Sequence, residues 1–113
     1  MSLPLWRSLL YVPAIEERFV AKAAARGADA IILDCEDSIP PARKAEARAA
    51  LAAAVPRVRA GGADVLVRIN RPLDMAVADI AAGCAAGADG FVLTKIMGPD
   101  HVRLLAELTG AAK

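Results

Sequence analysis

The chain has 113 residues, 57% of them hydrophobic and 24% charged, which predicts at most one globular domain and excludes a disordered chain. Its formal net charge of +1 gives no general positive field, so we expect no nucleic acid as a partner. The longest uncharged run, residues 80–88, has nine residues against the roughly 18 that a membrane span needs, so we expect no membrane partner.

Four short apolar runs are predicted to be strands. The first covers residues 6–12, and the others cover residues 30–33, 65–67 and 90–93. Their continuous apolar character is typical of parallel strands that are covered on both faces. Each of the last three follows a Gly-Ala-Asp triplet, at residues 27–29, 62–64 and 87–89. The triplet glycine is expected to end the preceding helix with a positive φ.

Helical segments alternate with these runs. They are predicted over residues 15–26, from about residue 42, over about residues 73–86, and from about residue 99. Proline is tolerated in a first helical turn, so Pro40 and Pro41 can open the second helix, which Pro56 either kinks or ends. The βαβαβαβα order implies a parallel sheet with right-handed crossovers. An open doubly wound sheet, half of a (β/α)₈ barrel and a flavodoxin-like unit lacking a strand all fit this pattern.

Charged residues follow the last three apolar runs. Asp34, Glu36 and Asp37 follow the second run, Arg68 follows the third, and Lys95 follows the fourth. Parallel α/β folds bind their ligands at the carboxyl ends of the strands. Because an isolated buried charge is costly, we expect these groups to pair with one another or to line a polar pocket.

Structural roles for the same residues stay open. The three acids would then cap the following helix and form a salt bridge with Arg68. Lys95 could form a Schiff base, bind an anion or pair with an acid. A structural or substrate-orienting role is favoured over a Schiff base, because no neighbouring residue indicates a lowered pKa of Lys95. A further set is expected at the surface: Arg43, Arg48, Arg71 and His101.

Several motifs are absent from the sequence. It has neither G-x-G-x-x-G nor G-x-x-x-x-G-K, which argues against a dinucleotide or P-loop site. Cys35 and Cys84 are too few for a disulfide framework and lack the spacing of zinc ligands, so we expect a reduced, cytoplasmic location and two buried thiols. Residues 1–7 do not have the pattern of a secretory signal.

Blocks of sequence in chain order resemble the citrate lyase β-subunit-like (aldolase/citrate lyase) family, which includes malyl-CoA and citramalyl-CoA lyases. They are RSLLYVP at residues 7–13, LDCED at 33–37, VRIN at 67–70 and LTKI at 93–96, where the family usually has Leu-Pro-Lys-Val. Ala14 stands where the family usually has glycine. Together these blocks span nearly the whole chain.

The resemblance implies that residues 1–113 are the N-terminal part of a single (β/α)₈ TIM-barrel domain, in a homo-oligomer such as a trimer or hexamer. It implies a Mg²⁺-dependent carbon–carbon lyase that splits a β-hydroxy acyl-CoA, or a related carboxylic acid, through an enolate. By the same resemblance, Tyr11, Arg18 and Lys22 match positions that contact the CoA portion, and Lys95 is a substrate-binding candidate.

Arg68, Glu36 and Asp37 are the catalytic candidates that the resemblance gives. Arg68 would hold a substrate carboxylate, which a planar guanidinium can bind through two hydrogen bonds. Glu36 and Asp37, together with Asp34, look like acids that orient water on the metal. The direct Mg²⁺ ligands, a glutamate and an aspartate, are expected on later strands beyond Lys113, so no residue of this chain is expected to bind the metal directly.

A second, non-enzymatic interpretation also stays open. A complete barrel needs roughly 250 residues, so four βα units cannot close one and would leave strand edges exposed. The alternative is therefore a catalytically incompetent half-barrel that associates with itself or docks on another subunit.

Overall fold

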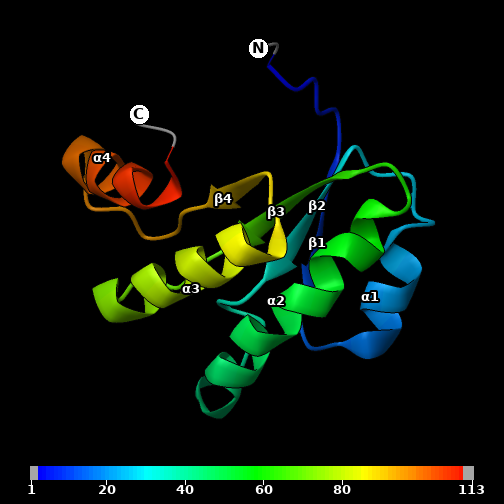
Figure 1. Cartoon of the computed structure of the whole chain (residues 1–113), viewed down its shortest axis with the longest axis horizontal. Coiled ribbons are helices and arrows are strands. Elements are labelled where there is room, and N and C mark those ends of the chain that lie inside the picture. The colour runs from blue at the N-terminus through cyan, green and yellow to red at the C-terminus, as the bar shows by residue number, and fades with distance from the viewer. Residues whose placement is uncertain (1–2, 111–113) are drawn as a thin grey trace.

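The computed structural model describes residues 3–110, in which four parallel strands alternate with helices (Figure 1). The strands are β1 (Leu9–Pro13), β2 (Ala30–Asp34), β3 (Asp64–Arg68) and β4 (Gly90–Val92). The α-helices are α1 (Glu17–Ala23), α2 (Lys44–Arg59), α3 (Leu73–Ala86) and α4 (Pro99–Ala106). Short 3₁₀ turns, η1 (Pro41–Arg43) and η2 (Glu107–Thr109), precede α2 and follow α4.

The strand order distinguishes between the architectures that the sequence pattern left open. Doubly wound and flavodoxin-like sheets reverse direction at a switch point, whereas here the order is β1-β2-β3-β4 throughout. Helices α1, α2 and α3 pack side by side on one face of the sheet (Figure 1). The prediction of four βα units from the N-terminal half of a (β/α)₈ barrel is therefore confirmed.

The main core lies between the sheet and these helices. Helix α2 is rich in alanine, the best helix former, and it buries Leu51, Val55 and Val58 in the same cluster as Leu33 and Val67 of the central strands. Successive side chains of a strand point to opposite faces. The face of the sheet away from the helices accordingly carries its own set of residues. One residue from each strand lies in register there: Tyr11, Ile32, Leu66 and Gly90.

The triplet glycines have the positive φ that was expected, but only the third of them ends its helix directly, because α1 and α2 already end at Ala23 and Arg59. The glycines of the three triplets have φ values of 78°, 95° and 88°, in chain order. Gly87 is the left-handed C-cap of α3, and Asp89 directly precedes β4. The Asp89 carboxylate accepts hydrogen bonds from the Val65 amide and from Arg59, so the triplet both ends a helix and ties the new strand to its neighbour.

Two element boundaries differ from the prediction, and one alternative that was left open is decided. Strand β1 begins at Leu9 and not at residue 6, because the backbone N–H groups of Arg7 and Ser8 donate to the Asp29 carboxylate and not to a strand carbonyl. Helix α1 is shorter than expected, since a turn closed by the hydrogen bond from the Glu16 amide to the Pro13 carbonyl precedes it. Pro56 lies inside α2 and does not end it.

The prediction for the two cysteines was half wrong. Cys35 is buried, as expected, but Cys84 is exposed because it lies on the outward side of α3, beside the groove between α3 and α4. Within residues 3–110, no helix combines the length and the apolar character that crossing a membrane requires.

Candidate functional site

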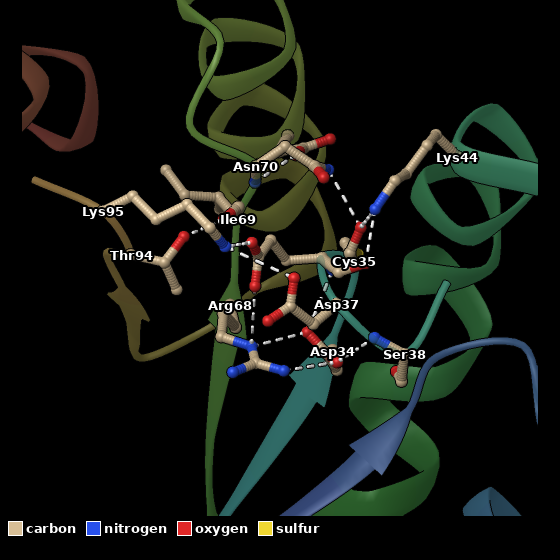
Figure 2. Close-up of polar contacts among 12 residues, drawn as sticks. Asp34, Cys35, Asp37, Ser38, Lys44, Arg68, Ile69, Asn70, Thr94 and Lys95 are labelled. Atoms are coloured by element: carbon tan, nitrogen blue, oxygen red, sulfur yellow. Dashed lines mark hydrogen bonds and ion pairs between the residues drawn. The ribbon is translucent and has the colours of Figure 1, made fainter. Parts of the chain in front are cut away.

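An ion pair between β2 and β3 forms the centre of the candidate site. Asp34 and Arg68 are register partners at the carboxyl ends of their strands, and Arg68 donates from Nε and Nη2 to the two Asp34 carboxylate oxygens, at 2.7 Å each (Figure 2). Asp34 also accepts the backbone N–H groups of Glu36 and Ser38, at 2.9 and 3.0 Å. Part of the structural role that the sequence left open is therefore present: Asp34 pairs with Arg68 and closes the loop after β2.

These contacts fix the charge state of both partners. Burial by itself would raise the pKa of Asp34, but hydrogen bonds from Arg68, Ser38 and Glu36 outweigh it and hold that pKa far below its ordinary value. The hydrogen bond to Asp34 is the main cause of the raised pKa of Arg68. The pair is therefore an ionised carboxylate beside a permanent cation.

Arg68 is held in place from a second direction. Its guanidinium carbon lies 4.5 Å from the centroid of the Tyr11 ring, a cation–π contact. Within residues 3–110, its Nη1 group has no hydrogen-bond partner, and its side chain is 19% exposed. Arg68 is thus oriented by Asp34 and Tyr11 while part of its guanidinium stays available to an anion.

A second charged group, from the loops after β2 and β4, lies beside this pair. Lys95 Nζ contacts the Glu36 carboxylate and lies 3.3 Å from Asp37 Oδ1 (Figure 2). The hydrogen bond to Glu36 is the main cause of the raised pKa of Lys95, and contacts with Glu36 and then Lys95 lower the pKa of Asp37. A Schiff base needs a neutral amine, so these contacts favour the orienting role for Lys95.

Two local features of this group are costly. Lys95 has a φ of 52°, a left-handed conformation that is uncommon outside glycine and is often found at functional sites. The Glu36 side chain is only 8% exposed, and its Oε1 atom has no hydrogen-bond partner within residues 3–110, with Arg68 Nε at 3.7 Å. A buried carboxylate oxygen without a donor is an acceptor that is ready for a further ligand or water.

A buried network behind the site was not foreseen. Asp79 of α3 has a fully buried side chain. It accepts hydrogen bonds from Arg48 Nε (2.8 Å), from the Asn70 backbone N–H (3.0 Å) and from Asn70 Nδ2 (2.8 Å). The expectation that Arg48 is solvated was wrong, because this ion pair draws it between α2 and α3. Arg43 and Arg71 are exposed, as expected, whereas His101 is half-buried and its Nδ1 accepts the Met97 N–H.

The network also fixes the loop that carries the acids. Asn70 Nδ2 donates to the Cys35 carbonyl at 2.9 Å, and Lys44 Nζ contacts the carbonyls of Cys35 and Glu36 (Figure 2). The position of Glu36 is therefore set by residues from β2, α2 and the loop after β3. The only sequence signal was Asp79, the one charged residue among residues 75–86 of α3.

Two predicted residues lie apart from this cluster. Arg18 and Lys22 are exposed on α1, where the Arg18 guanidinium lies 4.7 Å from the Phe19 ring centroid. Lys22 lines a groove together with Tyr11. Within residues 3–110, no hydrogen bond or ion pair joins Arg18 or Lys22 to the Arg68–Glu36 cluster, so Tyr11 is the shared element between the two regions.

No group of three or more His, Cys, Asp or Glu side chains within residues 3–110 is arranged to hold a metal ion. The donors that are present, Glu36 and Asp37, are carboxylates, which suit Mg²⁺ and its bound waters. With one free buried oxygen on Glu36, they fit an indirect contact with such an ion through water.

Known proteins resemble the chain along most of its length. The HpcH/HpaI aldolase/citrate lyase family model matches residues 7–113. A (3S)-malyl-CoA thioesterase of Cereibacter sphaeroides is 35% identical over 104 residues, which cover 91% of this chain and 36% of the relative. The mitochondrial citramalyl-CoA lyase of Rattus norvegicus is 30% identical (89% and 31% covered), and the citrate lyase subunit beta of Leuconostoc mesenteroides is 36% identical (81% and 31% covered). The chain spans about a third of the length of these relatives.

Proposed function

The chain belongs to the HpcH/HpaI aldolase/citrate lyase family, and from this premise we propose that it is the N-terminal part of a single (β/α)₈ barrel that acts as a Mg²⁺-dependent carbon–carbon lyase. The proposed substrate is a β-hydroxy acyl-CoA or a related carboxylic acid, split through an enolate. Relatives named for malyl-CoA and citramalyl-CoA support a CoA thioester. A cytoplasmic homo-oligomer, a trimer or hexamer, remains part of the proposal.

The observation that carries this proposal is the geometry of Arg68. Asp34 neutralises the guanidinium and fixes its plane, and Tyr11 supports it from one side. The Nη1 group is left to bind a carboxylate of the substrate by charge-assisted hydrogen bonds. Because this arrangement lies at the carboxyl ends of the strands, it is where a barrel of this kind binds its substrates.

The acids and Lys95 would complete the site. Lys95 pairs with Glu36 and Asp37 and would orient the oxygen atoms of the substrate. Glu36 Oε1 and Asp37 would accept hydrogen bonds from water that is bound to Mg²⁺, whose direct ligands we place outside this chain. The chemistry that Mg²⁺ supplies when bound is stabilisation of the negative charge that develops as the carbon–carbon bond breaks.

The CoA portion would bind beside Tyr11. Arg18 and Lys22 are exposed cations four residues apart on α1, and side chains at this spacing lie on the same side of a helix. They would bind the phosphates of CoA, while the thioester end reaches Arg68 past the Tyr11 ring. The groove that Tyr11 and Lys22 line together supports this path.

A thioesterase is the second candidate, because the 35% identical relative is named for hydrolysis of malyl-CoA. The products distinguish the two activities. A lyase releases an α-keto acid and an acyl-CoA without free thiol, whereas a thioesterase releases free CoA thiol and an intact hydroxy acid.

The test is an assay of the full-length protein that contains this chain, with malyl-CoA or citramalyl-CoA, in Mg²⁺ and after chelation. Keto acid is followed as its phenylhydrazone and free thiol with a disulfide reagent. We expect Mg²⁺-dependent keto acid, and a loss of about 100-fold or more in kcat/KM for Arg68→Lys, because lysine cannot keep both the Asp34 pair and a substrate carboxylate. Arg43→Lys, in an exposed pair with Glu46, is the matched control. Full turnover by Arg68→Lys would contradict the assignment.

A further inference from the structure

The peptide group between Cys35 and Glu36 is held on both sides. Its N–H donates to the Asp34 carboxylate at 2.9 Å. Its carbonyl, that of Cys35, accepts Asn70 Nδ2 at 2.9 Å and lies 3.3 Å from Lys44 Nζ (Figure 2). Because a peptide group is planar, it can turn only as one unit, and a turn here would break the bonds at both ends.

The next peptide group, which begins at the Glu36 carbonyl, is also held. That carbonyl contacts Lys44 Nζ and accepts the Ile39 N–H at 3.1 Å. Lys44 therefore bridges the carbonyls on both sides of the Glu36 Cα atom. The backbone has only two soft dihedral angles at each residue, so fixing both peptide groups also fixes the direction in which the Glu36 side chain leaves the backbone.

Asn70 is itself held in one orientation. Its Nδ2 group donates to Asp79 Oδ2 (2.8 Å) as well as to the Cys35 carbonyl, and its backbone N–H donates to the same Asp79 oxygen (3.0 Å). Both partners of Nδ2 are acceptors, and a reversed amide would place its oxygen against them. Asp79 is in turn bonded to Arg48, so the contact from Asn70 to the loop after β2 is supported by α2 and α3.

The Glu36 side chain extends into the candidate site from this fixed backbone. One of its carboxylate oxygens contacts Lys95, whereas Oε1 has no hydrogen-bond partner within residues 3–110. Figure 2 shows Lys44 reaching the loop after β2 from α2, and Lys95 reaching it from the loop after β4. Lys44 and Asn70 contact only the backbone of the loop after β2, so they can set the position of Oε1 without touching it.

We propose that Lys44 and Asn70 are positioning residues for the reaction, an inference that rests on the proposed lyase function. They act through the Glu36 backbone and hold Oε1 where it would accept a hydrogen bond from water bound to Mg²⁺. The carboxylate of the substrate would bind Arg68, which is oriented by other contacts. Loss of either positioning residue therefore lowers kcat and the affinity for Mg²⁺, and leaves the KM for the acyl-CoA nearly unchanged.

The first experiment replaces Lys44 by methionine in the full-length protein that contains this chain. Lys44 is half-buried in the first turn of α2, and methionine keeps an unbranched side chain there, so the variant should fold. We expect kcat with malyl-CoA or citramalyl-CoA to fall about tenfold, and the Mg²⁺ association constant of the substrate-free protein, measured by calorimetry, to fall about as much. KM should change by less than about twofold. Lys44→Arg keeps a cationic donor and should retain most of both quantities.

Arg57→Met is the matched control. Arg57 lies in the same helix and forms an exposed ion pair with Glu17, so this variant removes one positive charge without changing a contact to the loop after β2. Its kcat, KM and Mg²⁺ affinity should equal those of the wild type. A general effect of charge removal or of damage to α2 would appear in both variants, and equal losses in Lys44→Met and Arg57→Met would overturn the proposal.

A second measurement tests the backbone directly. Hydrogen exchange of the metal-free protein, followed by mass spectrometry over residues 34–39, should be faster in Lys44→Met than in the wild type or Arg57→Met. Asn70→Ala keeps the backbone hydrogen bond to Asp79 and removes only the side-chain contacts, and it should show the same faster exchange and the same loss of kcat. Faster exchange with unchanged kcat and Mg²⁺ affinity would mean that the contacts only stabilise the loop, and would overturn the proposal.

The outcomes separate this inference from the proposed function. If the wild type forms keto acid in Mg²⁺ and Lys44→Met equals it in kcat and Mg²⁺ affinity, the positioning roles are wrong and the lyase assignment stands. If the wild type neither binds Mg²⁺ nor forms keto acid, the lyase assignment is wrong and the positioning roles fall with it. Lys44→Met decides the proposal even where Asn70→Ala does not fold, because Lys44 is partly exposed.

Discussion

Replacing Asp79 by alanine is expected to cost more stability than any exposed substitution in this chain. The change removes the acceptor for Arg48 Nε, for the backbone N–H of Asn70 and for one N–H of its side chain. Asn70 is buried, so its donors cannot turn to water. Arg48 is 27% exposed and can recover part of its hydration.

The expected loss of stability follows from the burial of Asn70 and the partial exposure of Arg48. Breaking a buried ion pair by removing one partner costs about 3–5 kcal/mol, and the partial exposure of Arg48 favours the lower end, about 3 kcal/mol. With an m-value of about 2 kcal/mol/M in urea, the unfolding midpoint should fall by about 1.5 M. Asp79→Asn keeps one acceptor and the side-chain volume, and should lose less.

The assay is urea unfolding followed by far-ultraviolet circular dichroism, with all variants at one protein concentration, because association would shift the midpoint. Asp100→Ala is the control, since Asp100 pairs with Arg103 where both side chains are largely exposed, and its midpoint should not move measurably. If Asp79→Ala shifts the midpoint no further than Asp100→Ala, the buried network does not stabilise the fold and the reasoning is wrong.

Two further predictions concern thiols and acid. Burial is the main cause that raises the pKa of the Cys35 thiol to about 12. At about pH 8 a thiol reagent should therefore modify only the exposed Cys84. Rapid modification of the Cys84→Ser protein would contradict this prediction. The folded-state pKa of Asp34 lies below its unfolded value of about 3.9, so its stabilising contribution is present above about pH 4 and is lost as the pH falls further. Urea midpoints measured from about pH 6 to about pH 3 should therefore fall less steeply for Asp34→Asn, and equal slopes would count against the pairing.

The strands and the family could be predicted from the sequence because their signals are local. Each Gly-Ala-Asp triplet lies directly before or at the start of a strand, and the apolar runs that follow the triplets are short and continuous. The resemblance to the aldolase/citrate lyase family is confirmed by the match over residues 7–113. Both kinds of signal can be read over a few consecutive residues.

The contacts that define the site could be predicted only in part. Charges at strand ends indicated a cluster, but the register that places Asp34 opposite Arg68 arises from pairing between strands 34 residues apart. The Arg48–Asp79 pair depends on how α2 packs against α3, and no local pattern records that packing. The exposure of Cys84 likewise depends on the position of α4 relative to α3.

The triplet aspartates have a consequence for how the chain acquires its structure. Each one joins its strand to a part of the chain that was synthesised earlier: Asp29 bonds to Arg7 and Ser8, Asp64 to Trp6, and Asp89 to Val65 and Arg59. A parallel sheet usually folds slowly because its strands are distant in sequence. Here an aspartate at or just before the start of each new strand anchors it to a part of the chain that is already in place, which favours growth of the sheet one unit at a time, in the order in which the ribosome releases it.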